Sequence, residues 1–413
     1  MPGVCVIGGG TAGAEAAREA AVGGAEVTVI EKSEPPAPPW KSWPDLIHQS
    51  SAAGDTVASS RRIEGPHAAK VLAKEAKSAG LDFILTSDGS KIRFDSVVAA
   101  TGSGFEPTSF PGHRKPGVLI LDGMGQYAHL GRIRGSIEGA VVHGEGTRGL
   151  QVSDRLAGSG RRVHVLISCW QEVEPSAAVF AVIRQAAEER GVSIATGTLA
   201  KAVGSGSLEA VVAGGTILPC DTLAVLPRRI PRVIPMLARL GRRGGLLVDR
   251  GLRSSSPRTF AAGGCAELGT GLPQSAILEG EAAISGRIAG ANSTGQHLSM
   301  DSVRLSESTF FGLRWTRVGG WPFPAGASGI RLETVSRRWA TDSACTIVYE
   351  RLSGRVVGLE TVQGASAGSI VMPPMAPGSA SLRTLAYGGL GGSSDISLVS
   401  DTARLGLRDW SRF

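Results

Sequence analysis

The chain has 413 residues, of which 42% are hydrophobic and 19% are charged, and its formal net charge is +7. This length predicts two or three domains, and the composition excludes a disordered or fibrous chain. The positive charge is compatible with anionic nucleotides or an acidic partner, although an arginine-rich solvated surface is the simpler explanation. No interleaved basic and aromatic run indicates nucleic acid. A strand is predicted from Val4 and no apolar run nears about 20 residues, so we expect no secretory signal, no transmembrane segment and a cytoplasmic location, with peripheral membrane contact left open.

The first glycine motif follows an apolar strand at the start of the chain. Its sequence is VCVIGGGTAGAEAA, and its glycines are Gly8, Gly10 and Gly13. Such glycines let the backbone approach a pyrophosphate, which the positive end of the helix predicted for 11–21 attracts. The next predicted strand, 25–30, is followed by Glu31, where a carboxylate accepts hydrogen bonds from an adenosine ribose. Strand, turn, helix and acid together predict a dinucleotide-binding unit.

A second unit repeats this plan. Its sequence is AVVHGEGTRGLQV, and its glycines are Gly144, Gly146 and Gly149. Each unit then contains a hairpin, the first turning at 88–89 and the second at 214–215. Gly89 stands six residues before Asp95, as Gly215 does before Asp221. A duplicated dinucleotide fold with an inserted β-meander is a specific architecture, and it predicts two bound nucleotides.

Cysteine chemistry is not supported by the spacing of the thiols. The five cysteines are Cys5, Cys169, Cys220, Cys265 and Cys345. Neither a CxxC nor a CxxxxC occurs, which argues against a zinc ribbon or a local redox dithiol. We expect most of them to be small buried hydrophobic residues and expect no metal.

Two further motifs extend the pattern: AATGS at 99–103 and TFAAGGCAE at 259–267. With these, the chain resembles the two-dinucleotide-binding flavoproteins, the FAD-dependent pyridine nucleotide-disulfide oxidoreductases, over nearly its whole length. The resemblance implies an α/β fold with two Rossmann-like domains that contain inserted β-meanders, and a C-terminal α+β interface domain. The implied domains are 1–112 with 245–298 for FAD, 113–244 for NADH or NADPH, and 299–413 for the interface.

The C-terminal third changes to short alternating runs with glycine turns. TFFGLRWTRVG and CTIVYERLSGRVVGLETV predict strands, and the second segment predicts a hairpin turning at 353–354. In the family that the chain resembles, this domain forms a homodimer and covers the flavin edge. A small independent β domain is the alternative.

The resemblance assigns FAD to the first unit. The residues implied to bind it are Gly8, Gly10, Thr11, Ala12, Gly13, Glu31, Lys32, Lys41, Ala100, Thr101, Gly102, Gly263, Gly264 and Ala276. A helix predicted for 275–288 would pack beneath the flavin ring, although an ordinary core helix explains its pattern equally well. Gly264 stands where the family has an aspartate that binds a ribityl hydroxyl. Losing one charged hydrogen bond costs about 1.5–3 kcal/mol, so we expect FAD to bind weakly and to be sub-stoichiometric after purification.

The second unit is assigned NADH or NADPH by the same resemblance. The residues implied to bind it are Gly144, Gly146, Thr147, Arg148, Gly149 and Ser168. The second strand ends in Ser168 and Cys169, with no acid for a ribose, and the pair Arg161 and Arg162 precedes that strand, away from a phosphate. Glu145 lies inside the glycine turn, where its charge would repel a pyrophosphate unless the side chain points away. The choice between NADH and NADPH stays open.

The resemblance also implies which residues adjust the flavin. Relatives that reduce electron-transfer proteins place a lysine near the reactive flavin nitrogen, paired with a glutamate. In this chain PPAPPWKSW supplies Lys41 at a comparable offset, and Gln151 takes the place of the glutamate. We expect Lys41 to stabilise negative charge on reduced flavin and Gln151 to be its neutral hydrogen-bonding partner. A solvated lysine in a proline-rich loop is the alternative.

The expected reaction is hydride transfer from NADH or NADPH to FAD, followed by electron transfer to an acceptor without a cysteine intermediate. The acceptor is an iron-sulfur protein, oxygen or a quinone, and the net charge favours a small acidic protein. His297 is the last histidine, so the C-terminal His-Glu pair of disulfide reductases is missing. Two alternatives remain: a redox-silent FAD-binding or nucleotide-binding subunit, and a flavin dehydrogenase with a non-nicotinamide donor.

Overall fold

The computed structural model describes residues 3–32, 70–158, 161–170, 174–236, 238–269, 281–300, 305–319, 332–364 and 402–403. The chain divides into two compact units. Unit 1 contains Met1–Ser42, Gly54–Glu106 and Arg229–Asp301; unit 2 contains Trp43–Ala53, Pro107–Arg228 and Ser302–Phe413. The sequence-based domain boundaries remain predictions.

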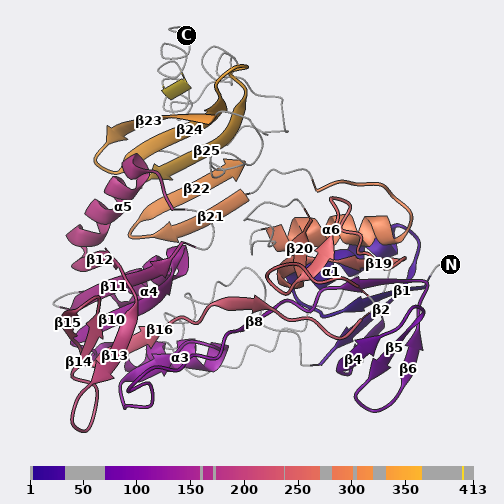
Figure 1. Cartoon of the computed structure of the whole chain (residues 1–413), viewed down its shortest axis with the longest axis horizontal. Coiled ribbons are helices and arrows are strands. Elements are labelled where there is room, and N and C mark those ends of the chain that lie inside the picture. Colours follow the sequence, from indigo (N-terminus) through magenta and orange to yellow (C-terminus); the bar gives the residue numbers. More distant parts are fainter. Residues whose placement is uncertain are drawn as a thin grey trace. The chain divides into compact units, whose positions relative to one another are not determined.

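Unit 1 is built on a parallel sheet with the strand order β19-β7-β1-β2-β3 (Figure 1). Its strands are β1 Gly3–Ile7, β2 Glu26–Glu31, β3 Lys70–Ala73, β7 Ser96–Ala99 and β19 Thr259–Ala261. The central strand β1 is almost wholly buried because its side chains Val4 to Ile7 face neighbours on both sides. Continuous apolar runs are typical of such doubly covered parallel strands.

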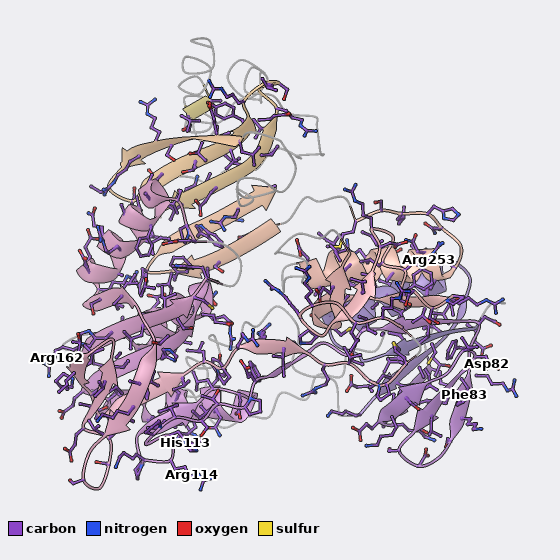
Figure 2. The ribbon with its side chains drawn as sticks, viewed as in Figure 1. Asp82, Phe83, His113, Arg114, Arg162 and Arg253 are labelled. Atoms are coloured by element: carbon purple, nitrogen blue, oxygen red, sulfur yellow. The ribbon has the colours of Figure 1, made fainter. Side chains whose placement is uncertain are left out.

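A meander is inserted before β7, as the sequence predicted. Its antiparallel strands are β4 Ala76–Ala79, β5 Phe83–Thr86 and β6 Lys91–Arg93. Figure 2 shows Asp82 and Phe83 at the start of β5, in this outer hairpin layer of unit 1. The turn between β5 and β6 contains Gly89 at a φ of 82°, a conformation that glycine adopts without strain. The predicted turn at 88–89 is confirmed.

Two small strand pairs complete unit 1. They are β8 Ser103–Phe105 with β17 Arg229–Pro231, and β18 Leu246–Val248 with β20 Ala266–Leu268.

The helices α1 (Thr11–Val22) and α6 (Ala282–Ser293) pack against each other (Figure 1). Small residues line their contact. A Cβ on Gly286 would overlap the carbonyl oxygen of Ala12, and one on Gly290 would overlap that of Ala16. This backbone contact explains why α6 continues five residues past the predicted end at 288. The beginning of the predicted helix, from 275, lies outside the described residues.

Unit 2 repeats the parallel sheet in the order β12-β11-β10-β16-β9. Its strands are β9 Val118–Ile120, β10 Gly139–Glu145, β11 Arg162–Cys169, β12 Val192–Thr196 and β16 Thr222–Val225. Its helices are α3 Met124–Ile133, α4 Gly146–Leu156 and α5 Ala177–Glu189. The second meander is antiparallel and consists of β13 Leu199–Val203, β14 Ala210–Ala213 and β15 Thr216–Pro219. Its predicted turn at 214–215 is confirmed.

One aspartate in each unit explains why the repeat preserves the spacing after the hairpin turn. Asp95 Oδ2 accepts a 2.7 Å hydrogen bond from the backbone N–H of Gly3, at the start of β1. Asp221 Oδ2 accepts the N–H groups of Glu138 and Gly139, at 2.8 and 3.2 Å, where β10 begins. Each carboxylate therefore links the end of the meander to the strand that precedes the glycine turn. This strand is β1 in unit 1 and β10 in unit 2.

The C-terminal part of unit 2 is an antiparallel sheet in the order β21-β22-β25-β24-β23. Its strands are β21 Leu305–Phe310, β22 Leu313–Gly319, β23 Leu332–Ala340, β24 Ser343–Glu350 and β25 Val356–Gln363. The predicted hairpin turning at 353–354 is confirmed, and TFFGLRWTRVG is itself a hairpin that turns at 311–312. This sheet packs on α5 (Figure 1). Its buried side chains share one hydrophobic core with the parallel sheet.

A buried ion pair joins this sheet to the segment before α5. The Arg317 guanidinium lies 2.7 Å from Glu360 Oε1, and the two residues are 5% and 0% exposed. The Trp315 indole N–H donates to the same oxygen at 2.8 Å, while Glu360 Oε2 accepts the backbone N–H of Ser176 at 2.9 Å. Arg317 also donates to the carbonyl oxygen of Glu174.

Neutralising one partner of this pair is expected to weaken unit 2. Glu360→Gln leaves a buried positive charge at Arg317 and should lower the free energy of unfolding by about 3–5 kcal/mol. The transition can be followed in urea by tryptophan fluorescence. Glu307→Gln is the matched control, because Glu307 and Arg314 form an exposed pair on the same sheet, worth at most about 1 kcal/mol. Equal shifts in both variants would contradict the structural role of the buried pair.

Among the helices of the described residues, none is long and apolar enough to cross a membrane.

Candidate nucleotide-binding sites

Both glycine turns lie where the strand order of their sheet reverses. The chain leaves β1 towards β2 on one side, while β7 lies on the other side; β11 and β16 flank β10 in the same way. In open α/β sheets, the carboxyl edge at such a switch point is where nucleotides bind. The two predicted sites therefore occupy equivalent positions in two separate sheets.

The first turn depends on close backbone approach. Gly8 has a φ of 104°, and a Cβ there would overlap the carbonyl oxygen of Ala100. A Cβ on Gly13 would overlap the carbonyl oxygen of Gly8, which the first turn of α1 covers. Gly10 differs, because a Cβ there would have no atom of the described residues within 4 Å. Within the part of the chain that the structure describes, the space above Gly10, at the N-terminus of α1, is therefore open to a ligand.

A carboxylate flanks this open turn. Glu31, at the end of β2, is half-buried, and its Oε2 accepts a 2.6 Å hydrogen bond from the backbone N–H of Gly9. Lys32 is exposed beside it. Backbone N–H groups, a helix N-terminus and an acid at this edge fit the pyrophosphate and ribose of a dinucleotide.

The AATGS segment at 99–103 and the TFAAGGCAE segment at 259–267 both lie beside this turn. The N–H of Ala100 donates to the carbonyl of Ile7 at 2.8 Å, and the N–H of Ala262 donates to that of Ala99 at 2.9 Å. Thr101 Oγ1 donates to the carbonyl of Arg232, and Gly102 turns the chain at a φ of 71°. Gly263, at a φ of 69°, faces Ala12, since a Cβ there would lie 2.9 Å from that residue's Cβ.

Gly264, where the resemblance implies an aspartate, lies close to Ser103. A Cβ on Gly264 would lie 3.2 Å from the Cβ of Ser103 and 3.3 Å from its Oγ. A larger residue at 264 would therefore press on Ser103. The predicted FAD-binding residues that are described all lie in unit 1, whereas Lys41 and Ala276 lie outside the described residues.

The second turn has the same backbone plan with different side chains. Gly144 packs against Leu226, since a Cβ there would lie 2.6 Å from the Leu226 Cβ. Gly146, at a φ of 42°, is covered by an indole: its Cβ position lies 3.2 Å from Cε3 of Trp170. Among the described residues, a side chain thus fills the space above the second glycine in unit 2, and none fills it in unit 1.

Glu145 is buried in this turn, at 5% exposure. Its Oε1 accepts a long 3.6 Å hydrogen bond from the thiol of Cys169, an exposed residue at the end of β11. Burial raises the pKa of the Cys169 thiol, and the Glu145 carboxylate raises it further, while Ser168 and Arg228 oppose these effects.

Two partners of the predicted residue Arg148, Tyr127 and Pro227, were not predicted from the sequence. Arg148 donates to the Tyr127 hydroxyl at 3.1 Å and to the carbonyl of Pro227 at 3.4 Å, so α3 and the segment after β16 both reach the turn. The internal repeat contains a signal for this, because the segment after β16 corresponds to the AATGS segment after β7. Thr147 and Ser168 are half-buried at the same edge, and Gln151 is half-buried one turn further along α4.

The two arginines before the second strand do not form a phosphate clamp. Arg161 donates to the carbonyls of Ile137 and Leu156, at 3.0 and 3.3 Å. Arg162 is the first residue of β11 and lies on the outside of unit 2, as labelled in Figure 2. Both therefore lie at the end of β11 opposite to the glycine turn.

Four of the five cysteines are buried and Cys169 is exposed. Burial raises the pKa of Cys5, Cys220 and Cys345 to about 12 and also raises that of Cys265. The Cys265 thiol lies 3.3 Å from the carbonyl oxygens of Ala99 and Ala262. Thiols with raised pKa values form little thiolate near neutral pH, so these four are poor nucleophiles.

Comparison with known proteins identifies the family. Residues 2–280 match the family model described as pyridine nucleotide-disulphide oxidoreductase. The chain belongs to this family. The predicted family, fold class and cofactors, FAD with NADH or NADPH, are confirmed at this level.

Individual relatives are more distant. Bilirubin reductase of Mediterraneibacter gnavus (strain CC55_001C) is 29% identical over 265 residues, 61% of this chain and 36% of that protein. Rubredoxin-NAD(+) reductase of Pseudomonas putida is 28% identical over 193 residues, 45% of this chain and 50% of that protein. The chain thus spans half or less of these two curated relatives. The water-forming NADH oxidase from Lactobacillus brevis superposes with a TM-score of 0.80 at 16% identity, covering 100% of this chain and 99% of that chain, which shows the shared fold.

Two glycine substitutions should separate ligand binding from folding at the first turn. Gly10→Ala places a methyl group in the open space and should weaken FAD binding about tenfold or more, with the stability of the apoprotein changed by less than about 1 kcal/mol. Gly13→Ala forces the Gly8 carbonyl to move and should destabilise unit 1 by about 1–3 kcal/mol. FAD titration and thermal unfolding of the apoproteins measure both effects. Normal FAD affinity in Gly10→Ala would place the ligand elsewhere.

The exposed thiol gives a probe of the second turn. Cys169 should react with a disulfide reagent faster than the four buried cysteines, and its rate should rise with pH because the thiolate is the nucleophile. Glu145→Gln removes a charge that raises the pKa of this thiol, so it should speed the reaction near neutral pH. Saturating NADH should slow it. Cys169→Ser identifies the fast phase, and a rate unaffected by nucleotide would contradict a site at this edge.

Proposed function

We propose that this chain is an FAD-dependent oxidoreductase that takes a hydride from NADH or NADPH and passes the electrons to an acceptor without a cysteine intermediate. The observation that supports it most directly is the first turn, where the space above Gly10, which none of the described residues fills, lies beside the Glu31 carboxylate. Family membership supports the pairing of flavin with a pyridine nucleotide. The burial of four cysteines supports an oxidative half-reaction that does not involve thiols.

The residues of unit 1 have distinct roles in this proposal. The N–H groups at the start of α1 would hold the pyrophosphate, and Glu31 would accept the ribose hydroxyls. Thr101, Gly102 and Gly263 would shape the backbone beside the flavin. Lys41 would stabilise negative charge near the reactive nitrogen, with Gln151 as its neutral partner. When bound, FAD would supply the hydride-accepting chemistry, and the protein would supply position and charge.

For the acceptor we propose a small acidic electron-transfer protein. The net charge of +7 favours association with an acidic surface, and one relative is named a rubredoxin-NAD(+) reductase. Oxygen and a quinone are the other acceptors that the same half-reaction allows. We further propose a homodimer and a cytoplasmic location.

A second candidate function is favoured by one observation, the indole of Trp170 over Gly146. If the ring stays there, the second site is vestigial. The chain would then be a flavin dehydrogenase with a donor other than a nicotinamide, or a redox-silent FAD-binding subunit.

An anaerobic titration distinguishes these functions. Addition of NADH or NADPH to the FAD-loaded protein should bleach the flavin band, because hydride transfer reduces the flavin. Lys41→Met should slow the reduction roughly tenfold, since a loss of about 1.4 kcal/mol of charge stabilisation is one decade in rate. Lys77→Met is the control, because Lys77 is an exposed lysine of β4 paired with Glu75.

Three outcomes would count against the proposal. A flavin band that neither coenzyme bleaches favours the second candidate. An unchanged rate in Lys41→Met removes that residue from the reaction. A protein that takes up no FAD at all excludes flavin chemistry.

A further inference from the structure

The glycine turn of unit 1 shows where a side chain at its middle position would point. Gly9 stands between Gly8 and Gly10, and a Cβ there would lie 3.3 Å from Oε2, 3.5 Å from Cγ and 3.6 Å from Cβ of Glu31. A side chain at this position is therefore directed at the acid that ends the second strand. Because Gly9 has no side chain, the Glu31 carboxylate occupies this space.

Unit 2 has the opposite arrangement of residue types. Glu145 occupies the middle position of its turn, and no acid ends the second strand, which finishes in Ser168 and Cys169. Glu145 and Cys169 are neighbours across β10 and β11, and Oε1 of Glu145 lies 3.6 Å from the Cys169 thiol. The carboxylate thus reaches the end of β11 from the glycine turn.

We propose that Glu145 replaces the ribose-binding acid of the second site, so that this site binds NADH in preference to NADPH. This inference rests on the proposed function and specifies its donor. It explains together two departures from the motif, the acid that is missing at the end of β11 and the acid inside the turn. The acid of unit 2 stands in the glycine turn and not at the end of the second strand, but its carboxylate lies next to the end of that strand.

The position of the carboxylate determines what it attracts and what it repels. A ribose with free 2′- and 3′-hydroxyls offers two donors to a carboxylate at the end of the second strand. A 2′-phosphate at the same place would meet a like charge and lose both hydrogen bonds. The pyrophosphate faces the N–H groups at the start of α4, whereas the Glu145 side chain is directed at β11, so the two charges do not compete for one place.

Two residues near Glu145, Arg228 and Trp170, also affect coenzyme binding. Arg228 is exposed and close enough to Cys169 to oppose the rise of its pKa, so it is the cation that a 2′-phosphate would use. Trp170 covers Gly146 and has to turn away before any pyrophosphate reaches the turn. The free-energy cost of moving the ring is the same for both coenzymes, so it lowers both affinities equally. The ratio of the two affinities then depends on Glu145 and Arg228.

The test is equilibrium binding of NADH and NADPH to the FAD-loaded protein by calorimetry, which is independent of turnover. The wild type should bind NADH more tightly. Glu145→Gln keeps the shape of the side chain and removes the charge, so NADH affinity should fall about tenfold or more while NADPH affinity stays equal or rises. Glu145→Gly with Ser168→Glu returns the acid to the second strand and should restore the NADH preference. Glu209→Gln, an exposed acid of the meander in the same unit, should change neither affinity.

Each result decides the matter. Binding of both coenzymes with a ratio unchanged in Glu145→Gln overturns the role of Glu145 and leaves the proposed function standing. A preference for NADPH that is lost in Arg228→Gln also overturns it, in favour of the cation. Binding of neither coenzyme to the wild type overturns the nicotinamide donor and this inference together. An unchanged far-ultraviolet circular dichroism spectrum and FAD content show that the variants are folded.

Discussion

Close backbone approach at glycine is the constraint on which the first site depends. Gly8 and Gly13 bring the end of β1, the start of α1 and the end of β7 into direct contact, with no room for a Cβ between them. Gly286 and Gly290 bring α6 equally close to α1 from the other side. Main-chain contacts therefore hold α1 on two sides, one facing the sheet and the other facing α6. The N-terminus of α1 is thereby fixed beside Glu31, which is the arrangement that the proposed pyrophosphate and ribose contacts require.

The second unit preserves this backbone and changes the surface that it presents. Asp221 ties its hairpin to β10 as Asp95 ties the first hairpin to β1, so the sheet and its switch point are duplicated. The side chains around the turn are not duplicated, because Glu145, Arg148 and Trp170 replace Gly9, Ala12 and the open edge. Evolution of a duplicated fold can therefore keep the main-chain constraints while it alters the ligand, since the constraints and the specificity depend on different atoms.

The sequence predicted the features that depend on local rules. Both sheets, both meander turns and the hairpin at 353–354 followed from apolar strands and glycine positions, because these patterns act over a few residues. The end of α6 was missed, because its last turn is stabilised by contact with Ala16 of another helix. The cover of Trp170 over Gly146 was missed for the same reason: it is a contact between segments far apart in the chain. The proposed direction of Glu145 required the register of β10 on β11, which no single motif contains.

The buried ion pair of unit 2 links stability to the placement of the second site. Glu360 takes hydrogen bonds from Trp315, from Arg317 and from the backbone of Ser176, the residue before α5. A carboxylate that accepts from three groups in an apolar core is costly to leave partly satisfied, so the three groups are ordered together. Because α5 packs beside β12 and the antiparallel sheet packs on α5, the C-terminal sheet is part of the support of the nucleotide-binding sheet. Its removal would expose the core that positions β10 and β11, so the C-terminal strands belong to the structural framework of the second glycine turn.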